Sequence, residues 1–488
     1  MTASQPYRNR RLALYVLCTG MLMIVLDMTV VNVALPQIQD ELGFSSSNLA
    51  WVINAYLIAF GGLLLLAGRF GDLVGRRTVF MTGLTLFTLA SLLCGFAQTQ
   101  EMLVGARFLQ GIGGAMTSAV ILGMIVTMFP EPREQAKAIG VYAFVASAGG
   151  SIGLLAGGVL TELINWHWIF FINVPIAIAT GVFALRLLDR DEGIGFGQGA
   201  DVPGAVLITS SLMLGVYTIV SPAAENGWGD SGTLLLAGLS GALLVAFLAR
   251  EATAANPLIP LKIFRSRNVS GANAIQALSV SGMFAMFFLG TLYLQEILGY
   301  DALEIGFAFL PGTILMGLMS ARYSERLVMR FGARRTLIPG LVMIAASLLL
   351  FTRAPVGGNW AEHVLPVMVL LGLGAGTAFP ALMKLAMSDV GPHEAGLASG
   401  LVNTTAQVGA ALGLAVLATV SASRTDGLLE DGASTASALT GGYHLAFWIG
   451  AGLVLAAIGV AVTVLTPDEQ QDAAVALSSE EPAYSEAA

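Results

Sequence analysis

Long apolar runs recur along the whole chain and constrain its fold more than any other feature. Of the 488 residues, 56% are hydrophobic and only 11% are charged, whereas a soluble domain carries about 25% charged residues. Since a helix needs about 20 apolar residues to cross a bilayer, we predict an all-α polytopic membrane protein with fourteen spans. They lie near residues 12–35, 48–67, 78–97, 102–128, 137–160, 167–187, 203–221, 232–249, 270–293, 303–320, 336–352, 363–386, 395–420 and 443–465.

Lys and Arg residues lie mostly on one side of the predicted spans. With the N-terminus inside, the inner segments hold 20 of the 23 basic residues, Arg353 and Arg424 fall outside, and Arg107 falls within a span. Inner loops of membrane proteins carry the excess of Lys and Arg. We therefore expect both termini in the cytoplasm and a location in the cytoplasmic (inner) membrane.

A short charged segment, 68–77, separates the second and third predicted spans and reads GRFGDLVGRR. Each charge would cost about 2.5–3.5 kcal/mol in hydrocarbon, so we predict a tight loop at the cytoplasmic face. Gly68 and Gly75 allow the backbone to turn, and Asp72 is suited to the positive N-terminal end of a neighbouring helix. Arg76 and Arg77 can bridge to carboxylates or lipid phosphates. A simple basic anchor is the alternative, but the combination favours a gating loop.

A partial copy of this segment follows the tenth predicted span. Residues 321–325 read ARYSE, with an acid at the same offset, and Gly332 precedes Arg334 and Arg335. Two related loops predict two six-helix bundles with two helices inserted between them, an arrangement typical of transporters built from repeats. The expected parts are a cytoplasmic N-terminal tail (1–11), an N-terminal bundle (12–187), two inserted helices (203–249), a C-terminal bundle (270–465) and an acidic, disordered cytoplasmic tail (466–488).

Two charged residues lie within predicted spans. Asp27 lies roughly 15 Å and Arg107 roughly 9 Å from the outer end of its helix, by the helical rise. An acid at that depth is costly and is typical of proton or cation binding. A structural acid paired with a buried arginine or hydroxyls is the alternative for Asp27, and snorkelling to the outer surface is the alternative for Arg107. Their similar depth allows communication, but the sequence does not decide whether they touch.

Four polar residues within spans are candidates for a substrate cavity: Asn32, Gln110, Asn403 and Gln407. Asn403 and Gln407 are four residues apart and share a helix face. They can bond either to substrate or between helices, and these alternatives stay open.

Glycines recur every four residues in the fifth predicted span. Gly149, Gly153 and Gly157 make one smooth face for close helix packing, and Gly158 follows directly.

These motifs together resemble the fourteen-span drug:proton antiporter family of the major facilitator superfamily, over about residues 12–465. Segment 68–77 resembles the superfamily's loop between helices 2 and 3. Segment 26–36 is similar to the family's L-D-x-T-x-x-N-x-A-L-P, segment 107–111 to R-x-x-Q-G, and segment 166–175 to its signature at span 6. The glycines of the fifth predicted span match the family motif G-x8-G-x3-G-P-x2-G-G, except that Leu154 occupies the position of its proline. This helix should therefore be less kinked.

The resemblance implies a major facilitator fold and proton-driven efflux of amphipathic, cationic drugs or antibiotics by alternating access. It implies that Asp27 exchanges the proton with help from Arg107, and that segment 68–77 is a cytoplasmic latch. We expect a monomer that is no enzyme, with no catalytic or metal site and no cofactor beyond the proton motive force. Its partners are a small amphipathic substrate, protons and the lipid bilayer, with no nucleic acid.

Two other classes remain open. One is a major facilitator of another mode, such as an uptake symporter or a lipid or metabolite exporter, which the departure at Leu154 favours. The other is a membrane enzyme or channel, against which the lack of clustered nucleophiles, bases or metal ligands argues.

Overall fold

The computed structural model describes residues 7–45, 48–129, 131–191, 193, 195, 201–220, 222–387 and 395–466. These residues are predominantly helical and form no strand, which confirms the all-α prediction. Each predicted span coincides with a helix, and the sixth is broken into two helices. They are α1 (Tyr7–Leu42), α2 (Trp51–Val74), α3 (Arg76–Gly95), α4 (Gln100–Met128), α5 (Pro132–Leu163), α6 (Trp168–Phe171) with α7 (Asn173–Leu187), α8 (Val202–Val220), α10 (Ser231–Thr253), α11 (Arg267–Leu292), α12 (Ala302–Leu318), α14 (Ala333–Phe351), α15 (Leu365–Met387), α16 (Ala395–Glu430) and α17 (Thr435–Thr463).

Shorter helical segments join or extend these helices. They are η1 (Asn48–Ala50), α9 (Pro222–Asn226), η3 (Leu261–Arg265), η4 (Tyr293–Ile297), η5 (Met319–Tyr323), α13 (Ser324–Phe331) and η6 (Trp360–Val364). Polar side chains cap several of the long helices: Thr99 accepts a hydrogen bond from a backbone N–H of α4, and Ser266 does so for α11. Asp301 and Glu304 form a reciprocal capping box at the start of α12. Such caps satisfy N–H groups that a helix cannot satisfy itself.

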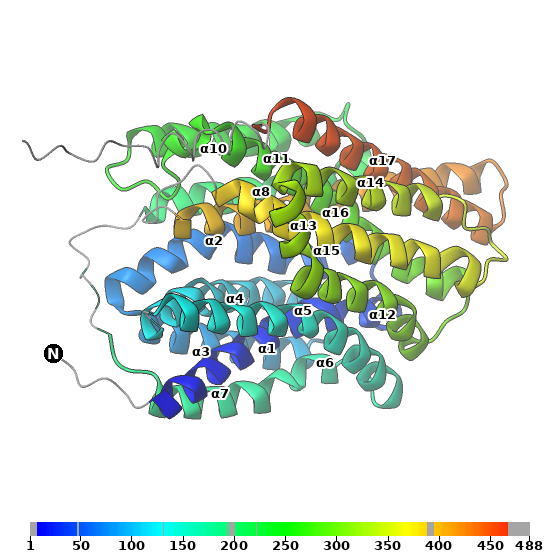
Figure 1. Cartoon of the computed structure of the whole chain (residues 1–488). Coiled ribbons are helices and arrows are strands. Elements are labelled where there is room, and N and C mark those ends of the chain that lie inside the picture. The colour runs from blue at the N-terminus through cyan, green and yellow to red at the C-terminus, as the bar shows by residue number, and fades with distance from the viewer. Residues whose placement is uncertain are drawn as a thin grey trace, which may run out of the picture.

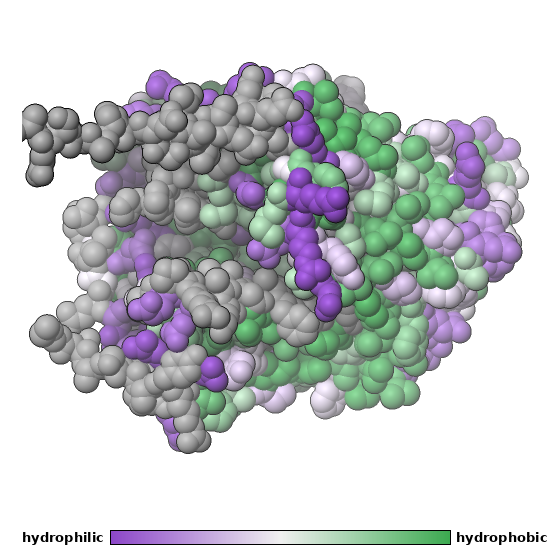
Figure 2. Space-filling view, in the orientation of Figure 1, coloured by the Kyte–Doolittle hydropathy of each residue, from purple (hydrophilic) through white to green (hydrophobic). Residues whose placement is uncertain are grey.

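The helical surface has the polarity of a membrane-spanning protein. Thirteen segments among the described residues are long and apolar enough to cross a bilayer. The helix α5 has 32 residues, and its part Ile152–Leu163 forms a shorter apolar helix. Figure 2 shows a hydrophobic band with hydrophilic residues toward both ends. Helices satisfy their own backbone groups, as hydrocarbon requires. The chain is therefore a multi-pass membrane protein.

The helices pack in two groups with α8 beside their seam (Figure 1). Among α1–α7 the main contacts join α3 to α4, α2 to α4 and α1 to α5, and among α11–α17 they join α14 to α15 and α11 to α16. The two groups meet where α5 packs on α12 and where α2 packs on α16. The inserted helix α8 packs on both α2 and α16, whereas α10 packs mainly on α8 and is the most exposed of the thirteen candidate spans found among the described residues.

The predicted loop at 68–77 is wrong in its form. The helix α2 continues to Val74, α3 begins at Arg76, and the connection is the single residue Gly75 with φ +97°. The charges needed only to leave the hydrocarbon, and a helix extended past the membrane face achieves this with its hydrogen bonds intact. The second copy has the same geometry, since Gly332 between α13 and α14 has φ +89°. Both connections use a conformation that glycine adopts readily.

Candidate functional site

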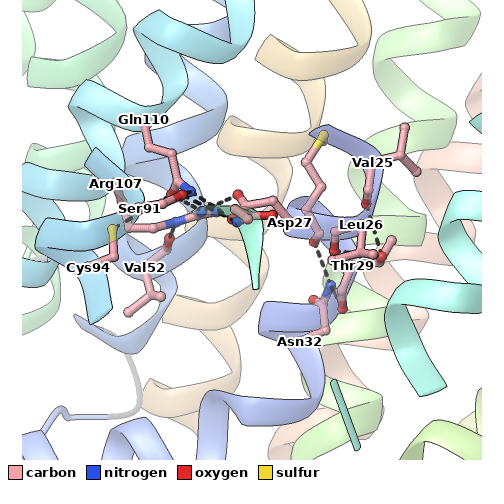
Figure 3. A network of polar contacts seen from close by, with 12 residues as sticks. Val25, Leu26, Asp27, Thr29, Asn32, Val52, Ser91, Cys94, Arg107 and Gln110 are labelled. Atoms are coloured by element: carbon pink, nitrogen blue, oxygen red, sulfur yellow. Dashed lines mark hydrogen bonds and ion pairs between the residues drawn. The ribbon is translucent and has the colours of Figure 1, made fainter. Parts of the chain in front are cut away.

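A buried ion pair joins α1 to α4 in the membrane-spanning part of the first helix group. Arg107 Nη1 lies 2.6 Å from Asp27 Oδ2, and the two side chains are 1% and 0% exposed (Figure 3). The contact that the sequence left undecided is therefore made. Snorkelling of Arg107 to the outer surface, the alternative considered above, is wrong, because the guanidinium is directed inward to this pair.

Uncharged polar groups complete the shell of Asp27. Gln110 Nε2 donates to Asp27 Oδ1 at 2.7 Å, and Asn173 Nδ2 donates to the same oxygen at 2.8 Å. Both amides also contact Ser91 Oγ, at 2.6 Å from Gln110 and 3.3 Å from Asn173. Gln110 Oε1 in turn accepts from Arg107 Nη1 at 2.7 Å. Four helices, α1, α3, α4 and α7, thus supply one network, in which Asp27 is the single acid among the described residues.

The guanidinium has partners besides the acid. Arg107 Nε donates to the backbone oxygen of Val52 on α2 at 2.9 Å. The ring of Tyr56 lies 4.4 Å and that of Phe170 lies 5.8 Å from the guanidinium carbon, within the range of cation–π attraction. These contacts do not involve Asp27. The guanidinium of Arg107 therefore keeps partners when Asp27 becomes neutral.

The local sequence of α4 explains how this geometry arises. Arg107 and Gln110 are three residues apart and therefore share a helix face. The glycines that follow let neighbouring helices approach closely. A Cβ at Gly111 would lie 2.5 Å from the backbone oxygen of Tyr56 on α2, and one at Gly113 would collide with the backbone of Phe87 on α3. The R-x-x-Q-G-x-G pattern thus supplies both the polar face and the close packing around it.

Sequence reasoning missed several members of the site, among them Ser91, Asn173 and Tyr56. Asn173 is fully buried and lies within segment 166–175, whose likeness to a family signature was noted without giving this side chain a role. An asparagine at a helix start inside an apolar segment was the available signal. Ser91 and Tyr56 carried none, because neutral hydroxyls are common in spans.

The predicted cavity residues do not gather in one place. Gln110 is fully buried in the Asp27 network, and Asn32 donates to the Met28 oxygen of its own helix at 3.1 Å. Gln407, on α16, packs against Gly61 of α2, where a Cβ would approach the Gln407 side chain to 2.7 Å. Their role in binding substrate stays a prediction, as does that of Asn403, which is exposed and also lies on α16.

A pocket of about 650 Å³ lies between α2, α4 and α8. None of the four predicted cavity residues lines it. Its lining is mostly apolar and comprises Phe44, Asn48, Trp51, Gln100, Glu101, Val104, Phe108, Thr209, Ser210, Met213, Leu214 and Tyr217.

The glycine face of α5 lies against α1. A Cβ at Gly149 would lie 3.0 Å from Val25, one at Gly157 would lie 2.8 Å from the Val30 oxygen, and one at Gly153 would collide with the Thr29 hydroxyl. Gly158 faces the other helix group instead, because its Cβ would lie 2.8 Å from the Ala302 oxygen of α12. The helix is continuous through Leu154, the position at which the resembling family has proline.

The connection between α2 and α3 forms a small charged cluster. Asp72 Oδ1 lies 3.3 Å from Arg76 Nη2, one helical turn later, and Arg76 Nη1 also donates to the Gly123 oxygen of α4 at 3.0 Å. The N-terminus of α3 is occupied by Asp191, whose oxygens accept from the backbone N–H of Arg76 at 2.6 Å and of Arg77 at 3.1 Å. The structure thus places Asp191, and not Asp72, at the positive end of this helix.

The remaining predicted glycines of this connection differ in their surroundings. A Cβ at Gly75 would lie 2.5 Å from the backbone oxygen of Asp191, whereas one at Gly68 would meet only Ala119, at 3.9 Å. The nearby Gly195 N–H donates to the Leu73 oxygen at 3.0 Å. The gating role of the cluster stays a prediction.

Fold and site together define a polytopic membrane protein with a buried acid–arginine pair among packed helices. A family model described as Major Facilitator Superfamily matches residues 17–414, and the chain belongs to that superfamily. It is accordingly a transporter and not an enzyme.

Curated relatives match almost the full length of the chain. It is 40% identical to the puromycin resistance protein pur8 of Streptomyces alboniger over 92% of this chain and 90% of that protein. It is 37% identical to the cephamycin export protein CmcT of Amycolatopsis lactamdurans over 93% and 91%. Among solved structures, a bacterial homologue of the human lysosomal transporter Spinster, in an inward-facing unoccupied conformation, has a TM-score of 0.67 at 15% identity, covering 94% of this chain and 97% of that one. That likeness shows the fold alone.

Proposed function

We propose that this protein exports amphipathic, cationic drugs or antibiotics across the cytoplasmic membrane in exchange for protons, with both termini in the cytoplasm. The observation that carries the proposal is the Asp27–Arg107 pair, in which a fully buried acid is held by an arginine and two amides. The relatives named for resistance to puromycin and export of cephamycin support the substrate class and direction.

The geometry suits an acid that alternates between two charge states. When Asp27 is ionised, Arg107 neutralises it. When Asp27 takes up a proton, Arg107 keeps the Val52 oxygen, the Gln110 oxygen and the Tyr56 ring. Asn173 carries both a donor and an acceptor, so rotation of its amide offers an acceptor to the new O–H. Protonation thus changes the links between α1 and α4 while both groups keep partners.

Proton flow supplies enough energy for export. One charge moving inward across 100 mV releases about 2.3 kcal/mol, which corresponds to roughly fifty-fold accumulation of an uncharged substrate exchanged for one proton. When a monovalent cation leaves, its charge offsets that of one proton, so the membrane potential drives its export only if more than one proton enters, and a pH gradient drives it otherwise. Alternating access would occur by movement of the two helix groups against each other, with the binding site between them.

Transport by everted membrane vesicles tests the proposal. Vesicles from an efflux-deficient host should accumulate ethidium or puromycin when energised and should release it when an uncoupler is added. Asp27→Asn should abolish the proton-dependent part. Glu162→Gln, which removes an exposed acid on α5, should transport normally at equal protein abundance.

Two outcomes would contradict the proposal. If Asp27→Asn retains full sensitivity to the uncoupler, Asp27 does not couple protons to transport. If accumulation requires ATP hydrolysis and persists without a proton gradient, the transport is not proton-driven.

A further inference from the structure

Two acidic residues lie together at the cytoplasmic base of the inserted helices. Asp201 immediately precedes α8, and Glu251 is the third-last residue of α10. Both residues are only 3% exposed. Acids are seldom buried unless they are paired, so their bonding partners decide what the pair can bind.

Each carboxylate uses one oxygen and leaves the other without a donor. Asp201 Oδ1 accepts from the Gly204 N–H at 3.0 Å and from Arg250 Nε at 3.0 Å. Glu251 Oε2 accepts from the Ile259 N–H at 2.8 Å. The remaining oxygens, Asp201 Oδ2 and Glu251 Oε1, are buried and have no hydrogen-bond partner.

The two unpartnered oxygens are directed to the same place. A Cβ added at Gly204 would lie 2.6 Å from Asp201 Oδ2 and 3.0 Å from Glu251 Oε1. The space that the missing side chain leaves is thus lined by one oxygen from each acid. Both oxygens therefore border the same small space.

Among the described residues, the charges that contact this space leave one negative charge in excess. Arg250 is the cation that contacts the pair, through Asp201, and its side chain is 45% exposed. The cytoplasmic half of α2 contributes Leu66 and Phe70 to the adjacent apolar cluster, and the segment after α10 contributes backbone N–H groups. Two ionised acids would be strongly disfavoured in this buried site, because they share one arginine and each keeps an oxygen without a hydrogen-bond donor.

We propose that Asp201 and Glu251 together bind one proton, forming a second protonation site separate from Asp27. The proton converts one carboxylate into an O–H donor, which satisfies the oxygen of the other and removes the excess charge. A metal ion fits less well, because no group of three or more Asp, Glu, His or Cys residues suited to a metal occurs in the described part of the chain. This proposal does not depend on export activity.

The site joins the inserted helices to the rest of the protein. Ala205 of α8, Phe247 of α10 and Leu258 after α10 form a buried cluster with Leu66 of α2. Loss of the shared proton would place like charges at the base of this cluster. The proton therefore holds the inserted helices against the cytoplasmic half of α2.

Infrared difference spectroscopy of the full chain in lipid nanodiscs tests the site without measuring transport. Spectra taken across a pH titration should contain the carbonyl band of a protonated carboxyl that is lost in Asp201→Asn and in Glu251→Gln. The band should persist in Asp27→Asn and in Glu162→Gln. Glu251→Gln should remain folded at every pH, since its amide can donate to Asp201 Oδ2 in place of the shared proton.

Gly204→Ala supplies a variant that leaves both acids in place. Its methyl group would occupy the space between the two oxygens, so the band should again be lost. A band unaffected by all three substitutions would overturn the proposal. Removal of the band by calcium at constant pH would also overturn it, by assigning the site to a metal ion.

Discussion

Removing the two charges of the central pair, singly and together, tests the site most directly. Asp27→Asn leaves the guanidinium of Arg107 buried without its anion, and Arg107→Gln leaves the carboxylate without its cation. Breaking a buried pair from one side costs about 3–5 kcal/mol. In Asp27→Asn the guanidinium still bonds Val52 and Gln110 at 2.9 and 2.7 Å. In Arg107→Gln the carboxylate still accepts from Gln110 and Asn173 at 2.7 and 2.8 Å. We therefore expect a loss near the lower end, about 3 kcal/mol, for each single variant.

The double variant should be far less destabilised than the sum of the singles, because it buries no unpaired charge. The interaction energy of the cycle should then be about 3 kcal/mol, well above the few tenths expected of independent sites. Reversible unfolding of the purified protein in mixed micelles measures all four free energies, and Glu162→Gln serves as the control. Additive costs, with the double variant about 6 kcal/mol less stable, would refute the reasoning that the two residues act as one unit. A stable double variant must also lack proton-dependent transport.

Three further substitutions test the packing and the connection between α2 and α3. Gly75→Ala forces a side chain into a positive φ and should cost about 1–3 kcal/mol in unfolding free energy, whereas Gly229→Ala, which meets nothing within 4 Å, should be nearly neutral. Gly153→Ala places a methyl group into α1 and should lower the thermal midpoint, unlike Gly105→Ala, whose surroundings are open. Asp72→Asn should slow transport several-fold in vesicles while equilibrium binding of substrate is kept; loss of binding in a folded protein would contradict the latch interpretation.

The helices could be predicted because the bilayer imposes strict requirements. A span needs about 20 apolar residues, and its backbone must be hydrogen-bonded internally. All fourteen predicted spans therefore have matching helices. The form of segment 68–77 was not predictable in the same way, since its charges exclude hydrocarbon but do not distinguish a loop from an extended helix.

The site was predicted in part, for reasons of energy. Asp27 and Arg107 were found because charges within spans are costly and therefore rare. Their contact was not predictable, since it depends on how α1 and α4 are rotated. Ser91 costs little in a span and gave no comparable signal, whereas Asn173 gave a signal, as an asparagine within an apolar segment, that was not used. The contact of Asp191 with Arg76 joins positions 115 residues apart in the chain, and no local pattern indicates it.

The helix α2 connects all of these features physically. Near its outer end the Val52 oxygen accepts from Arg107, and near its middle Gly61 meets Gln407 of the other helix group. Further along, Leu66 packs with the inserted helices, and Asp72 pairs with Arg76 where α2 ends. Because α2 is one continuous helix of 24 residues, the proposed protonation of Asp27 would act, through Arg107, on the same helix that contacts the other helix group. A helix with these four contacts can carry a change at the Asp27–Arg107 pair to the connection between α2 and α3, as the proposed coupling of protons to alternating access requires.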